Sequence, residues 1–417
     1  MNGAQGPTTP MRVVGVASVE HELTLLWREA ASSSLAAGGA IVARNSVLTL
    51  VVFAGGEGSA PRILREVESV TRQIASRAVI IVSEMGRSYG TPFDVSVGIA
   101  QREGMGALGE EILIRVSEEA TPHLPGTVLP LILSGLPSFL WWTGEPPWRS
   151  ELLEALVDGC DRMMVDTSET AQSAQALTAL YDLVRRKKAS TAFSDLNWAR
   201  QKPWRELTAQ FFDDRQLLPY LDGIDRVTIE YAAGEEDQPT NAAQGHLFAG
   251  WLASRLGWRP FGALGRGMDA ARQYTFVGSL GKHIALEITA RFGVPLRRWL
   301  DVAVDGGAAS SNDGRQAGPG QPTPAVGPGA LMSVHLHASA QGQPGSFAIA
   351  READLEHAST LCQAGAVYPS QTVSLRALGE ASRLVDQLQQ PGHDSIFEDA
   401  LTMAAQLTGS SDRRRTT

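Results

Sequence analysis

The first half of the chain alternates continuous apolar runs with segments of helical periodicity, and this alternation constrains the fold more than any other feature. Residues 46–54 (SVLTLVVFA) form an unbroken, largely β-branched run, which is typical of a strand buried on both faces of a sheet. Residues 61–77 follow, with apolar side chains at three- and four-residue spacing, and predict an amphipathic helix. Residues 78–83 (AVIIVS) predict the next strand. Strands that alternate with helices indicate a mostly parallel sheet covered on both faces.

The second half has a different pattern, with strand signals that follow one another without long helices between them. These signals lie at residues 226–231, 272–278, 283–289, 298–304 and 332–339. A helix is expected at residues 245–256, and two more at 380–389 and 395–407 close the chain. Strands joined as a meander pair antiparallel, so this half predicts a mainly antiparallel sheet with helices.

A chain of 417 residues is too long for one hydrophobic core, because single cores stop growing at roughly 250–300 residues. The sequence therefore predicts an α/β protein of two domains. Residues 1–215 form a mostly parallel α/β domain in this prediction, and residues 216–417 form an α+β domain with a mainly antiparallel sheet. Residues 306–329 are rich in Gly, Ala, Ser and Pro, a composition that predicts a flexible loop.

Charge, cysteine content and the N-terminus favour a cytoplasmic protein that binds neither nucleic acid nor membrane. The net charge is −9, whereas nucleic-acid binders carry a basic face. Cys160 and Cys362 are the only cysteines, too few for a disulfide framework. The first ten residues do not resemble a signal peptide. Residues 124–144 are uncharged but contain three prolines, which break a spanning helix, so buried strands with connecting turns are expected there.

Two glycine-containing loops are candidate phosphate-binding sites. Residues 55–59 (GGEGS) follow a strand and precede a helix, but they match neither a dinucleotide fingerprint nor a Walker loop. Residues 278–282 (GSLGK) lack the spacer of a Walker loop and fall between two strands, where a glycine hairpin is expected. A plain turn and a hairpin are the preferred interpretations.

His335 and His337 lie two residues apart in an expected strand and therefore point to one face. They could bind a metal together with His283 or Glu287 from another strand, although two ordinary strand histidines are the preferred interpretation. No G-x-S-x-G elbow is present. The sequence thus predicts no catalytic residue, no cofactor site and no metal site.

The strongest local signals are aromatic and basic. Adjacent tryptophans on a strand face opposite sides of its sheet, and tryptophan and arginine are the commonest anchors of protein interfaces. Packing within the protein is one interpretation of these residues, and an exposed docking surface or a ligand pocket are the alternatives. The candidate partner-binding residues are Trp141, Trp142, Trp198, Arg200, Trp204 and Arg205.

The blocks around these residues resemble the OpcA family, the glucose-6-phosphate dehydrogenase assembly proteins of cyanobacteria and actinobacteria. The matching blocks are LP at 136–137, FLWW at 139–142, GEPP at 144–147, DR at 161–162, VD at 165–166, DLNWAR at 195–200 and PWREL at 203–207. The resemblance implies a non-catalytic protein that binds glucose-6-phosphate dehydrogenase, favours its active oligomer and raises its activity. Such a protein supports NADPH supply through the oxidative pentose phosphate pathway. The alternative hypothesis is a sugar-phosphate enzyme of that pathway, such as a lactonase.

Overall fold

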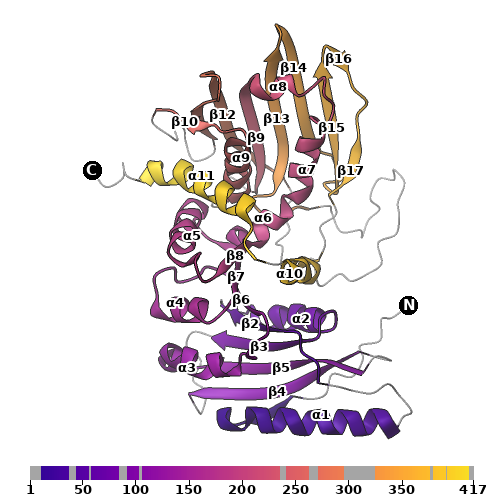
Figure 1. Ribbon diagram of the computed structural model, residues 1–417, viewed down its shortest axis with the longest axis vertical. Helices are drawn as coiled ribbons and strands as arrows, with labels where there is room; N and C mark the ends of the chain where they lie inside the picture. Colours follow the sequence, from indigo (N-terminus) through magenta and orange to yellow (C-terminus); the bar gives the residue numbers. More distant parts are fainter. Residues whose placement is uncertain are drawn as a thin grey trace. The chain divides into compact units, whose positions relative to one another are not determined.

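The computed structural model (Figure 1) describes residues 11–36, 44–55, 58–83, 92–102, 106–234, 241–262, 271–294, 325–375, 379–390 and 392–412. The strand expected at 298–304 and most of the loop expected at 306–329 lie outside these residues. The chain divides into two compact units, each assembled from separate segments. Unit 1 contains residues 1–169, 184–194 and 380–393, and unit 2 contains 170–183, 195–379 and 394–417. Residue 215, the domain boundary expected from the sequence, lies inside unit 2.

The first sheet is eight-stranded, in the order β1-β4-β5-β3-β2-β6-β7-β8. Strands β5, β3, β2, β6 and β7 pair in parallel, whereas β1–β4 and β4–β5 pair antiparallel. This arrangement confirms the mostly parallel sheet. The strands are β1 (Arg12–Val14), β2 (Leu48–Ala54), β3 (Ser76–Ser83), β4 (Phe93–Arg102), β5 (Gly106–Val116), β6 (Ser138–Thr143), β7 (Arg162–Val165) and β8 (Ala192–Asp195).

Every residue of β2 is buried, as its unbroken apolar run predicts. The main helices of unit 1 are α1 (Val19–Ala36), α2 (Ala60–Thr71), α3 (Leu124–Val128), α4 (Glu151–Asp158) and α10 (Glu380–Gln389). In the uncharged stretch 124–144, the expectation of buried strands with connecting turns is confirmed for β6 and wrong for residues 124–131, which are helical. Pro125 and Pro130 occupy first-turn positions, in α3 and in the 3-10 helix Leu129–Leu131, where the fixed φ of proline suits a helix.

The second sheet is nine-stranded, in the order β10-β11-β12-β9-β13-β14-β15-β16, with β17 also paired to β15. Its pairs are antiparallel except for β9–β12, which is parallel. The mainly antiparallel sheet is thus confirmed. The strands are β9 (Ile224–Gly234), β10 (Arg259–Pro260), β11 (Ala271–Val277), β12 (His283–Phe292), β13 (Leu331–Ala340), β14 (Gln343–Arg351), β15 (His357–Ala364), β16 (Ala366–Val367) and β17 (Thr372–Ser374).

One face of the second sheet carries the core of unit 2. Its apolar side chains, such as Ile229 and Phe347, pack with residues of the covering helices, and Figure 1 shows α7, α8 and α9 over this face. Gly250 of α9 lies close to α11, because a Cβ there would be 2.3 Å from the Ala400 carbonyl oxygen. The helices are α6 (Leu196–Arg200), α7 (Lys202–Gln210), α8 (Pro219–Asp222), α9 (Ala243–Arg255) and α11 (Ser395–Asp412), while α5 (Ser173–Lys187) runs from unit 2 into unit 1.

None of the described helices is both long enough and apolar enough to cross a membrane.

Candidate functional site

The first two candidate residues, Trp141 and Trp142, are neighbours on β6 and point to opposite faces of the first sheet. Both faces are covered there, because the two side chains are only 1% and 2% exposed. The Trp142 ring stacks on Phe53 of β2, with 4.0 Å between ring centroids and 7° between ring planes. The two indoles therefore contribute apolar area and ring stacking to the core of unit 1.

Trp198 and Arg205 form one packed pair in unit 2. The guanidinium carbon of Arg205 lies 3.4 Å from the centre of the Trp198 ring, a cation–π geometry, and Arg205 Nη1 donates to the Trp198 carbonyl oxygen at 2.8 Å. Trp198 Nε1 donates to Asp394 Oδ2 at 3.1 Å. Burial lowers the pKa of Arg205 to about 10, although Asp394 and Glu206 oppose the shift. Arg205 thus joins α7 to α6, and Trp198 joins α6 to the segment that begins α11.

The remaining candidates are Trp204, in the core beneath the second sheet, and Arg200, partly buried on α6. Trp204 is 2% exposed, and the Arg351 guanidinium lies 5.7 Å from its ring centre. All four indoles lie where the internal-packing interpretation expects them. Contact of any of the six candidates with a partner stays a prediction.

A buried histidine that sequence reasoning did not single out lies in α9. His246 is 0% exposed; its Nδ1 is 2.8 Å from the Ala242 carbonyl oxygen and its Nε2 is 2.8 Å from the Tyr274 hydroxyl oxygen. Because a carbonyl can only accept, Nδ1 carries the proton and Nε2 accepts from Tyr274. Burial, and secondarily the charge of Arg272, lower the pKa of His246 to about 4. The imidazole is therefore neutral at pH 7.

A second polar contact in the same unit joins three elements. Gln244 of α9 donates from Nε2 to Asn197 Oδ1 of α6 at 2.7 Å, and its Oε1 accepts from the Leu331 backbone N–H of β13 at 3.1 Å. The Asn197 backbone N–H in turn donates to Asp195 Oδ1 at 2.8 Å. Hydrogen bonds satisfy these buried groups, so part of the family-like block at residues 195–200 orients α6 against the second sheet.

Three carboxylates meet in unit 1 from segments far apart in the sequence. Asp166, Glu169 and Glu380 have oxygen atoms within 4.8 Å of one another. Arg62 of α2 lies among them, 3.3 Å from Glu169 and 3.1 Å from Glu380, and Glu169 also accepts from the Gly144 backbone N–H at 2.9 Å. Because Arg62 pairs with two of the three carboxylates, we interpret the cluster as an ion-pair network that joins α10 to α2.

His335 and His337 point to the same face of β13, as expected, with 3.9 Å between ring centroids. His335 Nε2 lies 2.7 Å from Ser346 Oγ on β14. Burial and the neighbouring His337 lower the pKa of His335. Among the described residues, three potential metal ligands meet at the carboxylates near Arg62 and not at the histidine pair.

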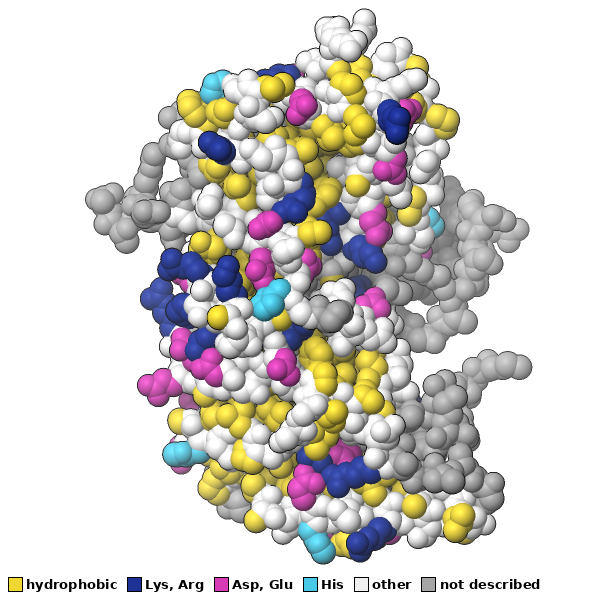
Figure 2. Space-filling view, in the orientation of Figure 1, with side chains coloured by type: hydrophobic (Ala, Val, Ile, Leu, Met, Phe, Trp, Pro, Cys, Tyr) yellow, Lys and Arg dark blue, Asp and Glu magenta, His cyan; other side chains and the backbone are white. Residues whose placement is uncertain are grey.

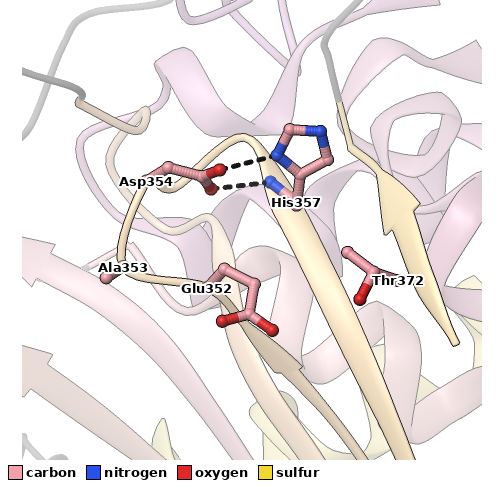
Figure 3. A pocket seen from close by; sticks show the side chains of 5 residues that line it. All are labelled: Glu352, Ala353, Asp354, His357 and Thr372. Atoms are coloured by element: carbon pink, nitrogen blue, oxygen red, sulfur yellow. Dashed lines mark hydrogen bonds and ion pairs between the residues drawn. The ribbon is translucent and has the colours of Figure 1, made fainter. Parts of the chain in front are cut away.

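A shallow pocket at the β14–β15 turn is lined by Glu352, Ala353, Asp354, His357 and Thr372 (Figure 3). Asp354 accepts from His357 Nδ1 at 2.6 Å and from the backbone N–H groups of Glu356 and His357 at 3.0 Å each. Partial burial opposes the effect, but these hydrogen bonds hold the pKa of Asp354 below its usual value. The Asp354–His357 pair thus stabilises a tight turn.

The basic end of α5 is paired with acidic residues of α4, and Figure 2 shows dark-blue and magenta side chains gathered over these helices. Lys187 lies 2.8 Å from Asp158 and 3.7 Å from Glu154, and Arg186 lies 3.4 Å from Glu154. Exposed pairs of this kind contribute little stability. They show that part of the basic run at the end of α5 is neutralised within unit 1.

The architecture defines a two-unit α/β protein, and comparison with known protein families identifies its family. Residues 67–182 match the family model described as the glucose-6-phosphate dehydrogenase subunit N-terminal domain, and residues 191–401 match the model of the C-terminal domain of that subunit. The chain belongs to the OpcA family.

Curated relatives carry the same family name. A protein of Nostoc punctiforme, provisionally named OxPP cycle protein OpcA, is 28% identical over 360 residues, which cover 85% of this chain and 69% of the relative. A protein of Synechocystis with the same provisional name is 35% identical over 151 residues, or 36% of this chain. That second match spans only 30% of the relative's length.

Solved structures with a similar chain trace include levoglucosan dehydrogenase in its apo form, with a TM-score of 0.46, 10% identity, and coverage of 89% of this chain and 98% of that chain. KijD10, a 3-ketoreductase from Actinomadura kijaniata, gives a TM-score of 0.44 and 9% identity, with 88% of this chain and 96% of that chain covered. These values are too low to support a functional argument.

Proposed function

We propose that this protein is a non-catalytic assembly factor of glucose-6-phosphate dehydrogenase, which binds the enzyme, favours its active oligomer and so supports NADPH production in the oxidative pentose phosphate pathway. One observation carries the proposal: two family models named for domains of a glucose-6-phosphate dehydrogenase subunit match residues 67–182 and 191–401. The OxPP cycle name of the Nostoc relative, which matches 85% of this chain, supports the same pathway.

An activator of this kind acts by binding one state of its partner more tightly than another. The partner's population shifts by the difference between the two binding free energies. Couplings of about 1–3 kcal/mol are typical and correspond to about 5–150-fold. Because such coupling is reciprocal, substrates that favour the active oligomer should tighten binding of this protein by the same factor.

The test is a titration of the host's glucose-6-phosphate dehydrogenase with the purified full chain. We expect a saturable rise in dehydrogenase activity, together with a complex of higher mass in light scattering. The reciprocal measurement is the affinity of this chain for the dehydrogenase with and without substrate. Unchanged activity and unchanged mass at micromolar concentrations of both proteins would reject the proposal. Hydrolysis of 6-phosphogluconolactone by the chain alone would instead indicate an enzyme.

A further inference from the structure

Among the described residues, the main core of unit 2 uses one face of the second sheet and leaves most of the other face uncovered; at one end, Ala232 and Met332 pack in a small separate cluster with Val326. Side chains on the core face, such as Val227, Val334 and Ile349, are 0–1% exposed. Their neighbours along each strand point the opposite way and are half-buried or exposed. We call this surface the open face, and it follows from the two-residue repeat of a strand. Its residues on β12, β9, β13, β14 and β15 are Ala285, Glu287, Thr289, Arg226, Thr228, Glu230, Ser333, His335, His337, Ser346, Ala348, Ala350, Ser359, Leu361 and Gln363.

The centre of the open face, on β13 and β14, has no Asp, Glu, Lys or Arg and is built from small or flat side chains. On β13 it presents Ser333, His335 and His337, and on β14 it presents Ser346, Ala348 and Ala350. A sheet face that stays in water usually carries charged side chains, whereas the centre of a protein interface is depleted of them. Small side chains also allow a second sheet to approach to about 10 Å, the spacing of packed sheets.

The size of the open face suits a dimer. Five strands spaced about 4.8 Å apart, with about eight residues of about 3.4 Å each, span a plane of roughly 650 Å² on each copy. A standard stable interface buries roughly 800 Å² of accessible surface per partner. The accessible surface of side chains exceeds their flat projection, so the open face is large enough to form a stable dimer interface.

Two of the charges beside this centre, on β9, are arranged for self-association. Arg226 and Glu230 lie on the same face of β9, on either side of Thr228. Arg226 is exposed and makes no hydrogen bond or ion pair with the residues that the structure describes. Glu230 accepts from Ser333 Oγ at 2.7 Å and lies 3.9 Å from Arg291. Arg226 and Glu230 of one chain lie four residues, or about 13 Å, apart along the strand, and in the structure Glu230 pairs with Arg291 rather than with Arg226.

We propose that the open face binds a second copy of this chain, sheet against sheet, across a two-fold axis that runs perpendicular to the strands over the row of Thr228, His335 and Ala348. A two-fold interface is self-complementary. This axis reverses the strand direction, so that Arg226 of each copy faces Glu230 of the other. Two ion pairs then flank the centre, while Glu287, in the same row on β12, faces Glu287 of the other copy at the edge of the interface. The proposal is independent of any contact with the dehydrogenase.

Sedimentation velocity of the purified full chain tests the proposal. We expect a species of twice the 44.5 kDa chain mass at micromolar concentration. Ala348→Asp places a charge at the centre and should raise the dimer dissociation constant at least about tenfold, because buried like charges face each other across the axis. The matched control is Ala209→Asp, an exposed position on α7, which should leave the dimer intact.

Charge reversal tests the orientation of the two copies. Arg226→Glu and Glu230→Arg should each weaken the dimer, and the double variant should restore it, because the restored pairs form between copies. Melting curves establish that each variant is folded. A native chain that stays monomeric overturns the proposal, as does a dimer that both Ala348→Asp and Arg226→Glu leave unchanged. Failure of the double variant to restore the dimer overturns the two-fold arrangement. If the native chain is monomeric and Ala348→Asp abolishes activation of the dehydrogenase, the open face binds that enzyme instead of a second copy.

Discussion

Protonation of His246 should destabilise unit 2 as the pH falls. The imidazole is 0% exposed, and burial lowers its pKa from 6.5 to about 4. In the unfolded chain this histidine takes up a proton near pH 6.5, whereas the folded protein excludes it until about pH 4. The unfolded state therefore binds more protons in this window, and the free energy of unfolding falls with decreasing pH. The contribution is fully present above pH 6.5.

The size of the change in the free energy of unfolding follows from how far the pKa of His246 is lowered. Each pKa unit corresponds to about 1.4 kcal/mol, so the whole window is worth roughly 3 kcal/mol. About 1 kcal/mol of this is lost between pH 7.5 and pH 5.5. Protonation at Nε2 also removes the acceptor of the Tyr274 hydroxyl and adds a positive charge near Arg272.

Guanidinium denaturation of the wild type and of His246→Gln, followed by circular dichroism at pH 7.5, 6.5 and 5.5, isolates this contribution. Other groups titrate in both proteins, so the useful quantity is the difference between their free energies of unfolding. We expect this difference to shrink by about 1 kcal/mol between pH 7.5 and pH 5.5. Thr408→Val, which removes a buried hydroxyl of α11 without removing a titratable group, is the control and should cost the same at each pH. A difference between wild type and His246→Gln that does not change with pH would refute the reasoning.

Two substitutions and one chemical modification test the packing within each unit. Arg205→Ala removes the hydrogen bond to the Trp198 carbonyl and the cation stacked on the Trp198 ring. The free energy of unfolding should fall by about 2–3 kcal/mol, which lowers the melting temperature by about 5–10 °C. An unchanged melting temperature would show that Arg205 is not structural. Gly250→Ala places a Cβ 2.3 Å from the Ala400 carbonyl oxygen. It should lower the free energy of unfolding, measured in urea, by about 1–3 kcal/mol because α9 and α11 must move apart. An unchanged free energy of unfolding would mean that the two helices can separate at no cost. Cys160 is buried with a pKa raised to about 12 by burial and the nearby Asp161, so a thiol reagent at pH 8 should modify it only after unfolding, and rapid reaction in the folded protein would contradict this.

Local sequence patterns predicted part of the unit 1 fold correctly, but they misplaced the end of one helix. The unbroken run at residues 46–54 predicted a strand covered on both faces, and β2 is such a strand. The helix expected at 61–77 ends earlier, as α2 at Thr71, because Arg77 belongs to β3. Arg77 is 1% exposed and pairs with Glu110 of β5 at 2.7 Å. Helical periodicity among neighbours carries no information about a partner on another strand.

The candidate site shows the same division. The tryptophan- and arginine-containing blocks were recognised as a family signature from the sequence, and the family models confirm that family. Their burial was not decided by residue type, because tryptophan and arginine anchor both cores and interfaces. Trp198 is held in place by Asp394, a residue from a distant segment whose position depends on how α11 packs.

The sequence by itself determined the class of the fold and the family, because strand and helix periodicities and short motifs are properties of neighbouring residues. The tertiary structure alone decided that residues 380–393 join unit 1 and that Arg62 meets Glu380. It also decided that His335 lies beside Thr228 and Ala348 on a face that the described residues leave largely uncovered. Register and burial of this kind depend on packing free energy summed over contacts between distant segments. No local pattern encodes that sum, so the open face can be recognised only from the tertiary structure of the second sheet.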